Sequence, residues 1–280
     1  MAHSLSRIAE DLVRSSRGDW LQWQGYTLST HFQPIYAVRE AACAGYEALL
    51  RAQDRDGAPV RPDRLFAQAV EASDGLLLDW ICRALHFRKF ATLDPGDRRL
   101  FINVHPEAAV KDARSARELD HLARFYGVAP KRVCVEILEG ACADEGLLRE
   151  SVAAYRAIGL GIAMDDFGVG RSNFDRIVAL RPDVVKVDRS ILTEAVGDSK
   201  ARRMLPAIIE LLHEAGAKVT LEGIESAAEA MVAIDSGADH LQGFHFARPA
   251  AVLPDDGATQ RTLAELRRMG GARLAAVGAG

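Results

Sequence analysis

Short apolar runs alternate with longer amphipathic stretches along most of the chain. The runs are rich in β-branched and aromatic side chains and are bounded by polar or glycine-containing segments, a pattern that predicts buried strands. They cover 31–38, 45–50, 99–104, 132–137, 159–164, 183–187, 218–221 and 240–246. Between most of them lie helix-sized segments, which include 76–90, 118–126, 145–158 and 200–215.

This alternation is typical of βα units around a mostly parallel sheet, and strands of this number close most simply into a (β/α)8 barrel. Only residues 39–44 join the first two runs. A connection this short cannot hold a helical crossover, so the first two strands should be antiparallel. The sequence therefore predicts an α/β fold, a modified (β/α)8 barrel with one antiparallel strand at its start.

Both ends of the chain fall outside this barrel, which we place at 26–250. The apolar residues between positions 5 and 13 have helical spacing, so residues 1–25 are expected to hold a lead-in helix over 4–23. The segment 251–280 is expected to hold one helix, 260–269, followed by a flexible end rich in glycine and alanine.

Composition and charge indicate how many domains the chain can form, which partners it can bind and where in the cell it is expected. Its 280 residues are 49% hydrophobic and 26% charged, which is enough to bury the core of one such domain. A net charge of −4 gives no basic footprint for duplex nucleic acid or for an anionic membrane. No run approaches the ~18 apolar residues of a membrane span, and the first 23 residues lack a signal peptide's apolar core. We therefore expect a cytoplasmic protein without direct membrane insertion, whose four cysteines, which show no CxxC pairing, are reduced packing residues.

A polar residue stands at the point where most of the predicted strands should end. These residues are Asn103, Glu136, Asp165, Asp166, Lys186, Glu222 and Gln242, and Glu47 has a similar place in its run. In an α/β barrel the C-terminal ends of the strands meet at one mouth. A single polar residue at such a position usually caps a loop or faces solvent, but this many in the same register predict one convergent site.

Five of these residues are carboxylates, and packed into one mouth they would repel one another unless cations lay among them. All-oxygen ligands with an amide, and no His or Cys at ligand spacing, favour Mg²⁺ or Mn²⁺ over zinc. The adjacent Asp165 and Asp166 suit a pair of ions, because one carboxylate can bridge while its neighbour serves the second ion. Two divalent ions about 3.5–4 Å apart can activate a shared water and clamp a phosphodiester for in-line attack.

Eight ordered segments of the chain resemble the signature set of the EAL family, bacterial phosphodiesterases that act on cyclic di-GMP. They are FQPIY (32–36), YEALLR (46–51), FINV (101–104), VEILE (135–139), MDDFGVG (164–170), VVKVD (184–188), LEGIES (221–226) and LQGF (241–244). The resemblance covers about residues 26–250. It implies a modified TIM barrel with one reversed strand that hydrolyses cyclic di-GMP to linear pGpG. The expected cofactors are two divalent cations, Mg²⁺ or Mn²⁺, and Ca²⁺ is expected to inhibit the reaction.

The resemblance also implies roles for individual residues. The ligands of the first ion would be Glu47, Asn103, Glu136 and Asp165, and those of the second would be Asp165, Asp166 and, directly or through water, Glu222. Lys186 would face the attacking water and form a catalytic group with Glu222 and Asp166. The alternative is a purely structural role, in which Lys186 is a strand-end lysine paired with Asp188. Substrate or water would contact Gln33, Leu50, Arg51, Asp188 and Gln242. Glu225 would support them from behind.

The segment 165–173 resembles the family's mobile loop, which borders the dimer interface in relatives and is anchored by a glutamate that Glu139 matches. Here the loop departs from the common DDFGTGYSS form at Val169, Arg171 and Asn173. We expect a homodimer in which this loop and the helix 174–180 lie near the subunit contact. Core packing of that helix against the barrel is the alternative.

Two other functions compete with hydrolysis. Some family members have lost metal ligands and only bind the dinucleotide, but here every ligand position is filled. A magnesium barrel of the enolase type also places carboxylates and lysines at strand ends, but it needs a capping domain for which only some 25 residues precede the first strand. The sequence contains no GGDEF motif and no sensory domain, so regulation would come from a partner protein or a larger assembly.

Overall fold

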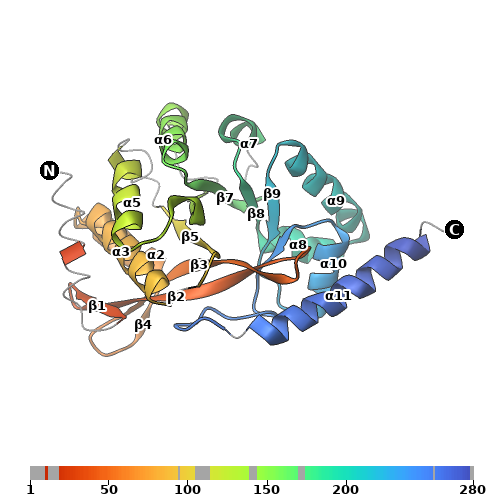
Figure 1. Ribbon diagram of the computed structural model, residues 1–280, viewed down its shortest axis with the longest axis horizontal. Helices are drawn as coiled ribbons and strands as arrows, with labels where there is room; N and C mark the ends of the chain where they lie inside the picture. The colour runs from red at the N-terminus through yellow and green to blue at the C-terminus, as the bar shows by residue number, and fades with distance from the viewer. Residues whose placement is uncertain are drawn as a thin grey trace.

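The computed structural model describes residues 10–11, 19–93, 95–104, 114–138, 144–169, 174–254 and 256–277. Within them the apolar runs form a barrel that the amphipathic segments surround (Figure 1). The barrel strands are β2 (Tyr26–Ala37), β3 (Ala42–Gln53), β5 (Arg99–Asn103), β6 (Val133–Leu138), β7 (Gly161–Phe167), β8 (Val184–Val187), β9 (Lys218–Leu221) and β10 (His240–Leu241). The helices are α2 (Pro62–Glu71), α3 (Gly75–Leu93), α5 (Arg114–Phe125), α6 (Glu145–Ala157), α7 (Phe174–Leu180), α8 (Arg189–Gly197), α9 (Ser199–Glu214), α10 (Ala227–Asp235) and α11 (Asp256–Val277).

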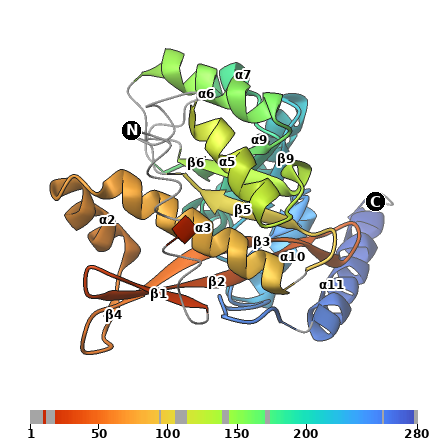
Figure 2. The same ribbon diagram turned by 60° about the vertical axis from the view of Figure 1, so that its left-hand side comes forward.

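The reversed strand is β2, and it closes the barrel. It pairs antiparallel with β3 on one side and with β10 on the other, whereas the remaining neighbours in the barrel run parallel. The predicted modified (β/α)8 barrel with an antiparallel start is therefore confirmed. Helix α3 lies across β2, β3 and β5 and covers the outer face of the hairpin (Figure 2).

A small apolar layer fills the interior of the barrel. It consists of Ile35, Phe101, Cys134, Ala163 and Val184, all almost fully buried and separate from the larger core between barrel and helices. On the parallel strands each layer residue stands two positions before a polar residue of the predicted site. Because side chains two apart on a strand share a face, the layer forms an apolar floor beneath the mouth.

The N-terminal prediction is wrong for its last residues. Trp20–Trp23 form a strand, β1, that pairs antiparallel with β2 instead of ending a helix. Its exposure alternates, with Leu21 and Trp23 buried, which is the period of a half-buried strand. Gln24 and Gly25 both have positive φ, 46° and 88°, as a two-residue hairpin turn requires.

Three other boundaries differ from the predictions. Helix α11 runs over Asp256–Val277, so most of the end expected to be flexible is helical. Strand β10 contains only His240 and Leu241, because the chain turns at the following residues instead of continuing the strand to 246. A short strand, β4 (Pro59–Val60), extends the sheet beside β3.

No helix among the described residues is both long and apolar enough to cross a bilayer. Of the four cysteines, Cys43, Cys82 and Cys134 are buried and form no disulfide. Burial raises the pKa of the Cys82 and Cys134 thiols, so these two stay protonated and pack as small apolar side chains. Cys142 lies outside the described residues.

Helix α3 carries a buried histidine into the core. His86 Nδ1 lies 2.8 Å from the Thr30 hydroxyl of β2, and both residues are buried. Burial, followed by the nearby charge of Arg83, lowers the pKa of His86 to about 3. An unfolded chain has no such environment and protonates this imidazole near its ordinary pKa of about 6.5.

We predict that His86 makes the folded state lose stability in mild acid. Between about pH 6.5 and about pH 3 the unfolded chain binds the additional proton, so the free energy of unfolding falls as pH falls. From about pH 7 to about pH 5 this loss should exceed that of His86→Gln by about 2 kcal/mol, measured by urea unfolding of both proteins. Parallel loss of stability in the two proteins would show that His86 is not held neutral.

Candidate active site

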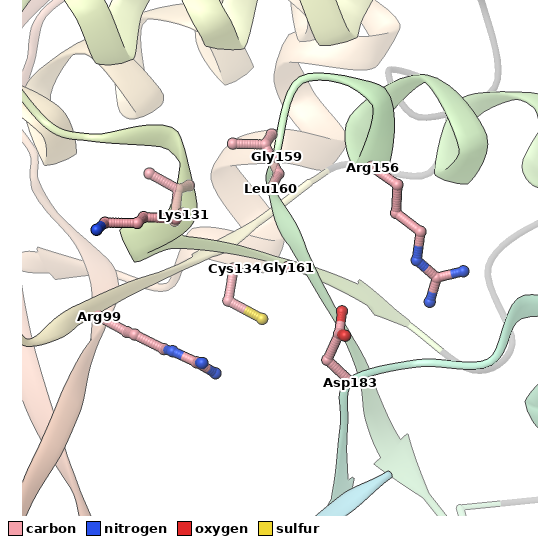
Figure 3. A pocket seen from close by; sticks show the side chains of 9 residues that line it. Arg99, Lys131, Cys134, Arg156, Gly159, Leu160, Gly161 and Asp183 are labelled. Carbon is pink, nitrogen blue, oxygen red and sulfur yellow. The ribbon is translucent and has the colours of Figure 1, made fainter. Parts of the chain in front are cut away.

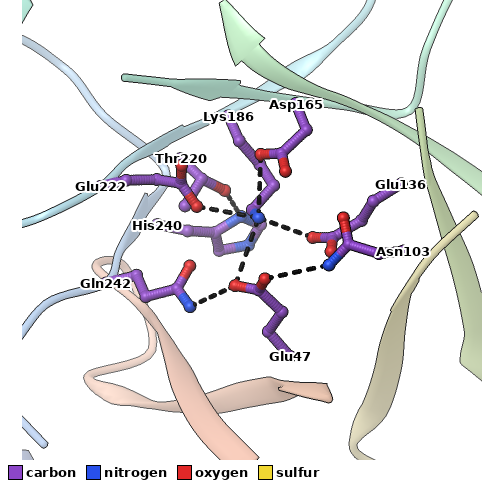
Figure 4. Close-up of polar contacts among 9 residues, drawn as sticks. All are labelled: Glu47, Asn103, Glu136, Asp165, Lys186, Thr220, Glu222, His240 and Gln242. Carbon is purple, nitrogen blue, oxygen red and sulfur yellow. Dashed lines mark hydrogen bonds and ion pairs between the residues drawn. The ribbon is translucent and has the colours of Figure 1, made fainter. Parts of the chain in front are cut away.

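Polar side chains from seven barrel strands meet at one end of the barrel. Glu47 lies on β3, Asn103 at the end of β5, Glu136 on β6, Asp165 on β7 and Lys186 on β8 (Figure 4). Glu222 and Gln242 follow directly after β9 and β10. A cavity of about 410 Å³ lies at this end, and its lining includes Glu47, Asp165, Asp166, Lys186, Glu222 and Gln242.

Lys186 is the hub of this cluster. Its Nζ lies 2.7 Å from Glu136 Oε1, 2.8 Å from Glu222 Oε1, 3.0 Å from Asp165 Oδ1 and 3.3 Å from Glu47 Oε2. The Lys186 side chain is only 1% exposed, and Glu136 is buried to the same degree. Its partners are therefore these four carboxylates and not Asp188, the partner that its structural alternative required.

Two amides hold Glu47 in place. Gln242 Nε2 donates to Glu47 Oε2 at 2.7 Å, and Asn103 Nδ2 donates to Glu47 Oε1 at 3.3 Å. Both amides come from strands that flank β2 and β3 around the barrel, so the reversed hairpin is tied to the parallel strands at the level of the site. Glu47 thereby contacts Lys186, Asn103 and Gln242 at once.

A local irregularity in β7 turns two consecutive aspartates toward the mouth. In a regular strand neighbouring side chains point to opposite faces. The pairing of β7 with β8 shifts register between Met164 and Phe167, and Asp166 has a φ of 56°, a left-handed conformation that is uncommon outside glycine. The bulge lets Asp165 and Asp166 line the same cavity, and strain of this kind is typical of functional sites.

The electrostatics of the cluster are dominated by burial and by crowding of like charges. Burial, and then the charge of Glu47, raise the pKa of Glu136 well above its ordinary value. Burial also raises the pKa of Glu222, and burial and Asp165 raise that of Asp166. Burial alone would lower the pKa of Lys186, but the surrounding carboxylates outweigh it and raise that pKa. One ammonium therefore offsets only part of the negative charge.

Several oxygens of the site are suited to hold cations. Asp165, Asp166 and Glu222 each offer a carboxylate oxygen, and these oxygens lie within 4.8 Å of one another. Glu136 Oε2 and Gln242 Oε1 are buried and accept no hydrogen bond from the described residues. Carboxylate and amide oxygens without other partners are the donors that Mg²⁺ and Mn²⁺ take, so the residues present fit these ions.

The remaining predicted site residues divide into three groups. Gln33, Asp188 and Glu225 line the cavity with the carboxylates. Arg51 lies on the same face of β3 as Glu47, but its Nη1 donates to the Leu50 carbonyl at 2.9 Å and it is not among the residues lining the cavity. Glu139 and residues 170–173, which include Arg171 and Asn173, lie outside the described residues.

Leu50 is placed differently from the prediction. Its side chain is buried in the core between barrel and helices, and Leu49 lines the cavity in its place. The reason is strand alternation: residues 47, 49 and 51 share one face of β3, whereas residue 50 points to the other. The same alternation counted from Glu47 in the sequence would have identified Leu49.

Sequence reasoning missed two further side chains that line the cavity. Arg189, at the start of α8, donates from Nη2 to Glu225 Oε2 at 2.8 Å. Phe244 is 44% exposed, and the guanidinium of Arg248 lies over its ring at 4.3 Å. The Gln-Gly-Phe order after β10 was a possible signal, since a Cβ on Gly243 would lie 2.1 Å from the Ile224 carbonyl oxygen, so only glycine permits this turn.

The chain is similar to known proteins in both sequence and fold. The sequence profile of the EAL domain matches residues 21–249. The chain belongs to the EAL domain family. The cyclic di-GMP phosphodiesterase RocR of Pseudomonas aeruginosa is 27% identical to it over 223 residues, 78% of this chain and 56% of RocR. The signaling protein YkoW of Bacillus subtilis is 29% identical over 224 residues, 78% of this chain and 28% of YkoW. The chain therefore spans well under two thirds of the length of these EAL relatives.

Solved structures of EAL proteins have the same fold. The PaMucR phosphodiesterase in complex with c-di-GMP superimposes with a TM-score of 0.72 at 25% identity, covering 80% of this chain and 92% of that one. The manganese and cy-diGMP complex of Klebsiella pneumoniae BlrP1 gives a TM-score of 0.73 at 25% identity, covering 82% of this chain and 57% of that one.

We predict that Glu136→Gln changes stability and metal binding in opposite directions. Burial raises the pKa of Glu136 in the folded state, so folding at neutral pH disfavours the charged carboxylate that the unfolded chain carries, and a neutral side chain of the same shape avoids this cost. In excess EDTA the melting temperature should rise by about 2–4 °C, which corresponds to about 1 kcal/mol. The rise in melting temperature that MnCl₂ gives the unaltered protein should largely disappear.

The control is Glu150→Gln, an exposed glutamate of α6 that should change neither quantity. A Glu136→Gln protein that melts lower in EDTA and still responds fully to MnCl₂ would contradict the role assigned to Glu136.

Proposed function

We propose that this chain is a bacterial cytoplasmic enzyme that hydrolyses cyclic di-GMP to linear pGpG with two bound Mg²⁺ or Mn²⁺ ions. The observation that carries the proposal is the cluster of carboxylates around Lys186, whose negative charge would repel a phosphodiester unless cations offset it. The RocR and PaMucR names support the substrate.

The polar side chains of the site would form two sets of metal ligands, one for each ion. Glu47, Asn103, Glu136 and Asp165 would hold one ion, and Asp165, Asp166 and Glu222 would hold the other. Ions at these places would lower the pKa of a water between them and neutralise charge on the scissile phosphate. Asp165 would serve both ions, and two contacts support this role: Asp165 shares Lys186 with Glu47 and Glu136, and its carboxylate also lies within the oxygen cluster of Asp166 and Glu222.

Lys186 would stabilise charge that develops during the reaction. A protonated amine fixed by several carboxylates can donate a hydrogen bond to the attacking water or to a phosphate oxygen without reorganising. Gln242 keeps Glu47 oriented toward this ammonium. Together they preorganise the site before substrate enters.

The outer part of the cavity suits a guanine nucleotide. Phe244 offers an exposed aromatic face backed by Arg248, on which a base can stack. Gln33 and Asp188 offer an amide and a carboxylate at the edge of the same cavity. A carboxylate can accept two hydrogen bonds from the N1–H and the 2-amino group of guanine, which favours guanine over adenine.

Direct assay separates hydrolysis from binding alone. Purified protein incubated with cyclic di-GMP and Mg²⁺ or Mn²⁺ should release pGpG, detected by chromatography. EDTA should abolish release, and Ca²⁺, which is larger and tolerates irregular coordination, should permit binding with little turnover. Saturable binding with no pGpG in any metal would identify a binding module instead, and full turnover in EDTA would contradict the metal site.

We predict that Lys186→Met lowers kcat by about 10²-fold or more at saturating Mn²⁺ and changes the Kd for cyclic di-GMP far less. Methionine keeps most of the buried volume while removing the charge. Lys200→Met, at an exposed position in α9, is the matched control and should turn over normally. An unchanged kcat for Lys186→Met would assign this lysine a structural role only.

We further propose that the chain forms a homodimer through α7 and the residues before it. Val169, Phe174 and Val178 are 57%, 38% and 68% exposed, whereas Ile177 and Leu180 of the same helix pack into the core. The apolar stripe of α7 thus serves the barrel on one side and is open on the other. Phe174 also contacts the Phe167 ring at 5.5 Å between centroids, which links α7 to the strand that carries Asp165 and Asp166.

A charge in this open face should break the dimer. We predict that Val178→Glu sediments as a monomer and turns over cyclic di-GMP several-fold more slowly, because α7 is connected to the aspartates through the Phe174 and Phe167 rings. Met204→Glu, at an exposed apolar residue of α9, should leave both properties unchanged. A dimer that survives Val178→Glu, or a fully active monomer, would exclude this interface or its coupling to the site.

A further inference from the structure

A second cavity, of about 260 Å³, lies at the opposite end of the barrel from the candidate active site. It is formed where β5, β6, β7 and β8 begin, so it is lined by residues that precede the site residues on the same strands (Figure 3). Arg99 starts β5, four residues before Asn103, and Cys134 stands two residues before Glu136. The apolar floor that contains Phe101 and Cys134 separates the two cavities.

The charge of this cavity is opposite to that of the mouth. Arg99, Lys131 and Arg156 border it, and they come from three different elements: a strand, a short turn of helix and the end of α6. Among the residues that the structure describes, Asp183 is the one acidic side chain in its lining, and Asp183 Oδ2 already accepts the Ile162 N–H at 2.8 Å. The lining therefore carries an excess of two positive charges in a chain whose net charge is −4.

Two of these cations are not ion-paired within the described part of the chain. Among the described residues, Arg99 and Lys131 form neither a hydrogen bond nor an ion pair with another side chain, and both are exposed to solvent. Arg156 differs, because its Nη2 donates to the Arg181 carbonyl and its place in the last turn of α6 offsets the helix dipole. No helix dipole accounts for Arg99, which lies on a strand.

Arg99 also borders a neighbouring cavity of about 260 Å³. This cavity adds a fourth cation, Lys218 at the start of β9, one carboxylate, Glu40, and an apolar wall that includes Phe101. Arg99 therefore borders two cavities, the first lined by more cations than carboxylates and the second by charges of both signs and apolar side chains. A ligand with a charged head and a larger body would fit such a pair of cavities.

We propose that this end of the barrel binds a small phosphorylated molecule. Its phosphate would lie among Arg99, Lys131 and Arg156, and its remainder would extend past Arg99 toward Lys218. Guanidinium groups hold phosphate oxygens through paired hydrogen bonds, and an ammonium adds a point charge without restricting geometry. A cavity of this size admits a phosphate with a sugar more readily than a protein segment, which favours a small ligand. The proposal does not depend on the chain hydrolysing cyclic di-GMP.

The test is calorimetric titration of the full chain in excess EDTA, where the metal-free carboxylates of the mouth repel anions. Pyrophosphate is the first probe, and inorganic phosphate and GMP distinguish a free phosphate from a nucleotide. We expect saturable binding with a Kd on the order of 0.1–1 mM for at least one of them. Tighter binding of GMP than of phosphate would identify a nucleotide, and equal binding would identify the phosphate group alone; either supports the site.

Variants that remove a positive or a negative charge from the lining test whether the ligand binds in this cavity. The double variant Arg99→Ala/Lys131→Ala, at two exposed positions, should weaken binding by about tenfold or more, whereas Asp183→Asn should strengthen it because it removes a negative charge beside the expected phosphate. Arg203→Ala, exposed on α9, is the control and should bind as the unaltered protein does. No saturable binding up to ~10 mM of any probe, or binding that survives the double variant, would overturn the proposal.

Discussion

The crowding of buried carboxylates around one ammonium is the constraint on which the rest of the structure depends. Lys186 contacts Glu47, Glu136, Asp165 and Glu222 within 3.3 Å. Burial, and then the negative charge of Glu47, raise the pKa of Glu136, and the single positive charge of Lys186 offsets this only in part. Charges in such a place are costly unless they are paired or bind a metal. The site therefore carries an excess of negative charge that divalent cations would offset.

The fold supplies this crowding by two local means. Alternation along the parallel strands places an apolar floor, including Phe101 and Val184, two residues before Asn103 and Lys186. The bulge at Asp165 and Asp166 breaks that alternation once and brings an additional carboxylate to the mouth. At the other end of the barrel four of these strands begin around a cavity that Arg99, Lys131 and Arg156 border, which is the basis for proposing a second, anionic ligand there.

The sequence predicted the barrel because its signals are local. Each apolar run is short enough to be a strand, and residues 39–44 are too few for a crossover helix, so the reversed hairpin followed from length alone. The carboxylates were found for a related reason: strand ends in a barrel converge, and a polar residue after an apolar run marks an end. The metal roles of these residues stay predictions, although the structure brings the residues together.

The failures share a physical cause, since each depends on contacts that one segment does not encode. Trp20–Trp23 form a strand because β2 offers a partner edge, and Trp20, Leu21 and Trp23 fit helical spacing nearly as well. Leu50 was assigned by motif and not by strand face. Arg189, the first residue of α8, and Phe244, in the loop after β10, line the cavity through contacts made in the folded chain, such as that of Arg189 with Glu225.

The number of Mn²⁺ ions bound at equilibrium would show whether the carboxylates around Lys186 hold a pair of cations. Free Mn²⁺ gives a strong electron paramagnetic resonance signal that binding broadens, so titration of the protein reports stoichiometry without substrate or turnover. The account predicts about two ions per chain, and substantially weakened binding of both in Asp165→Asn, because Asp165 is placed between the two ligand sets. Absence of bound Mn²⁺ at millimolar concentration, or unchanged stoichiometry and affinity in Asp165→Asn, would contradict it.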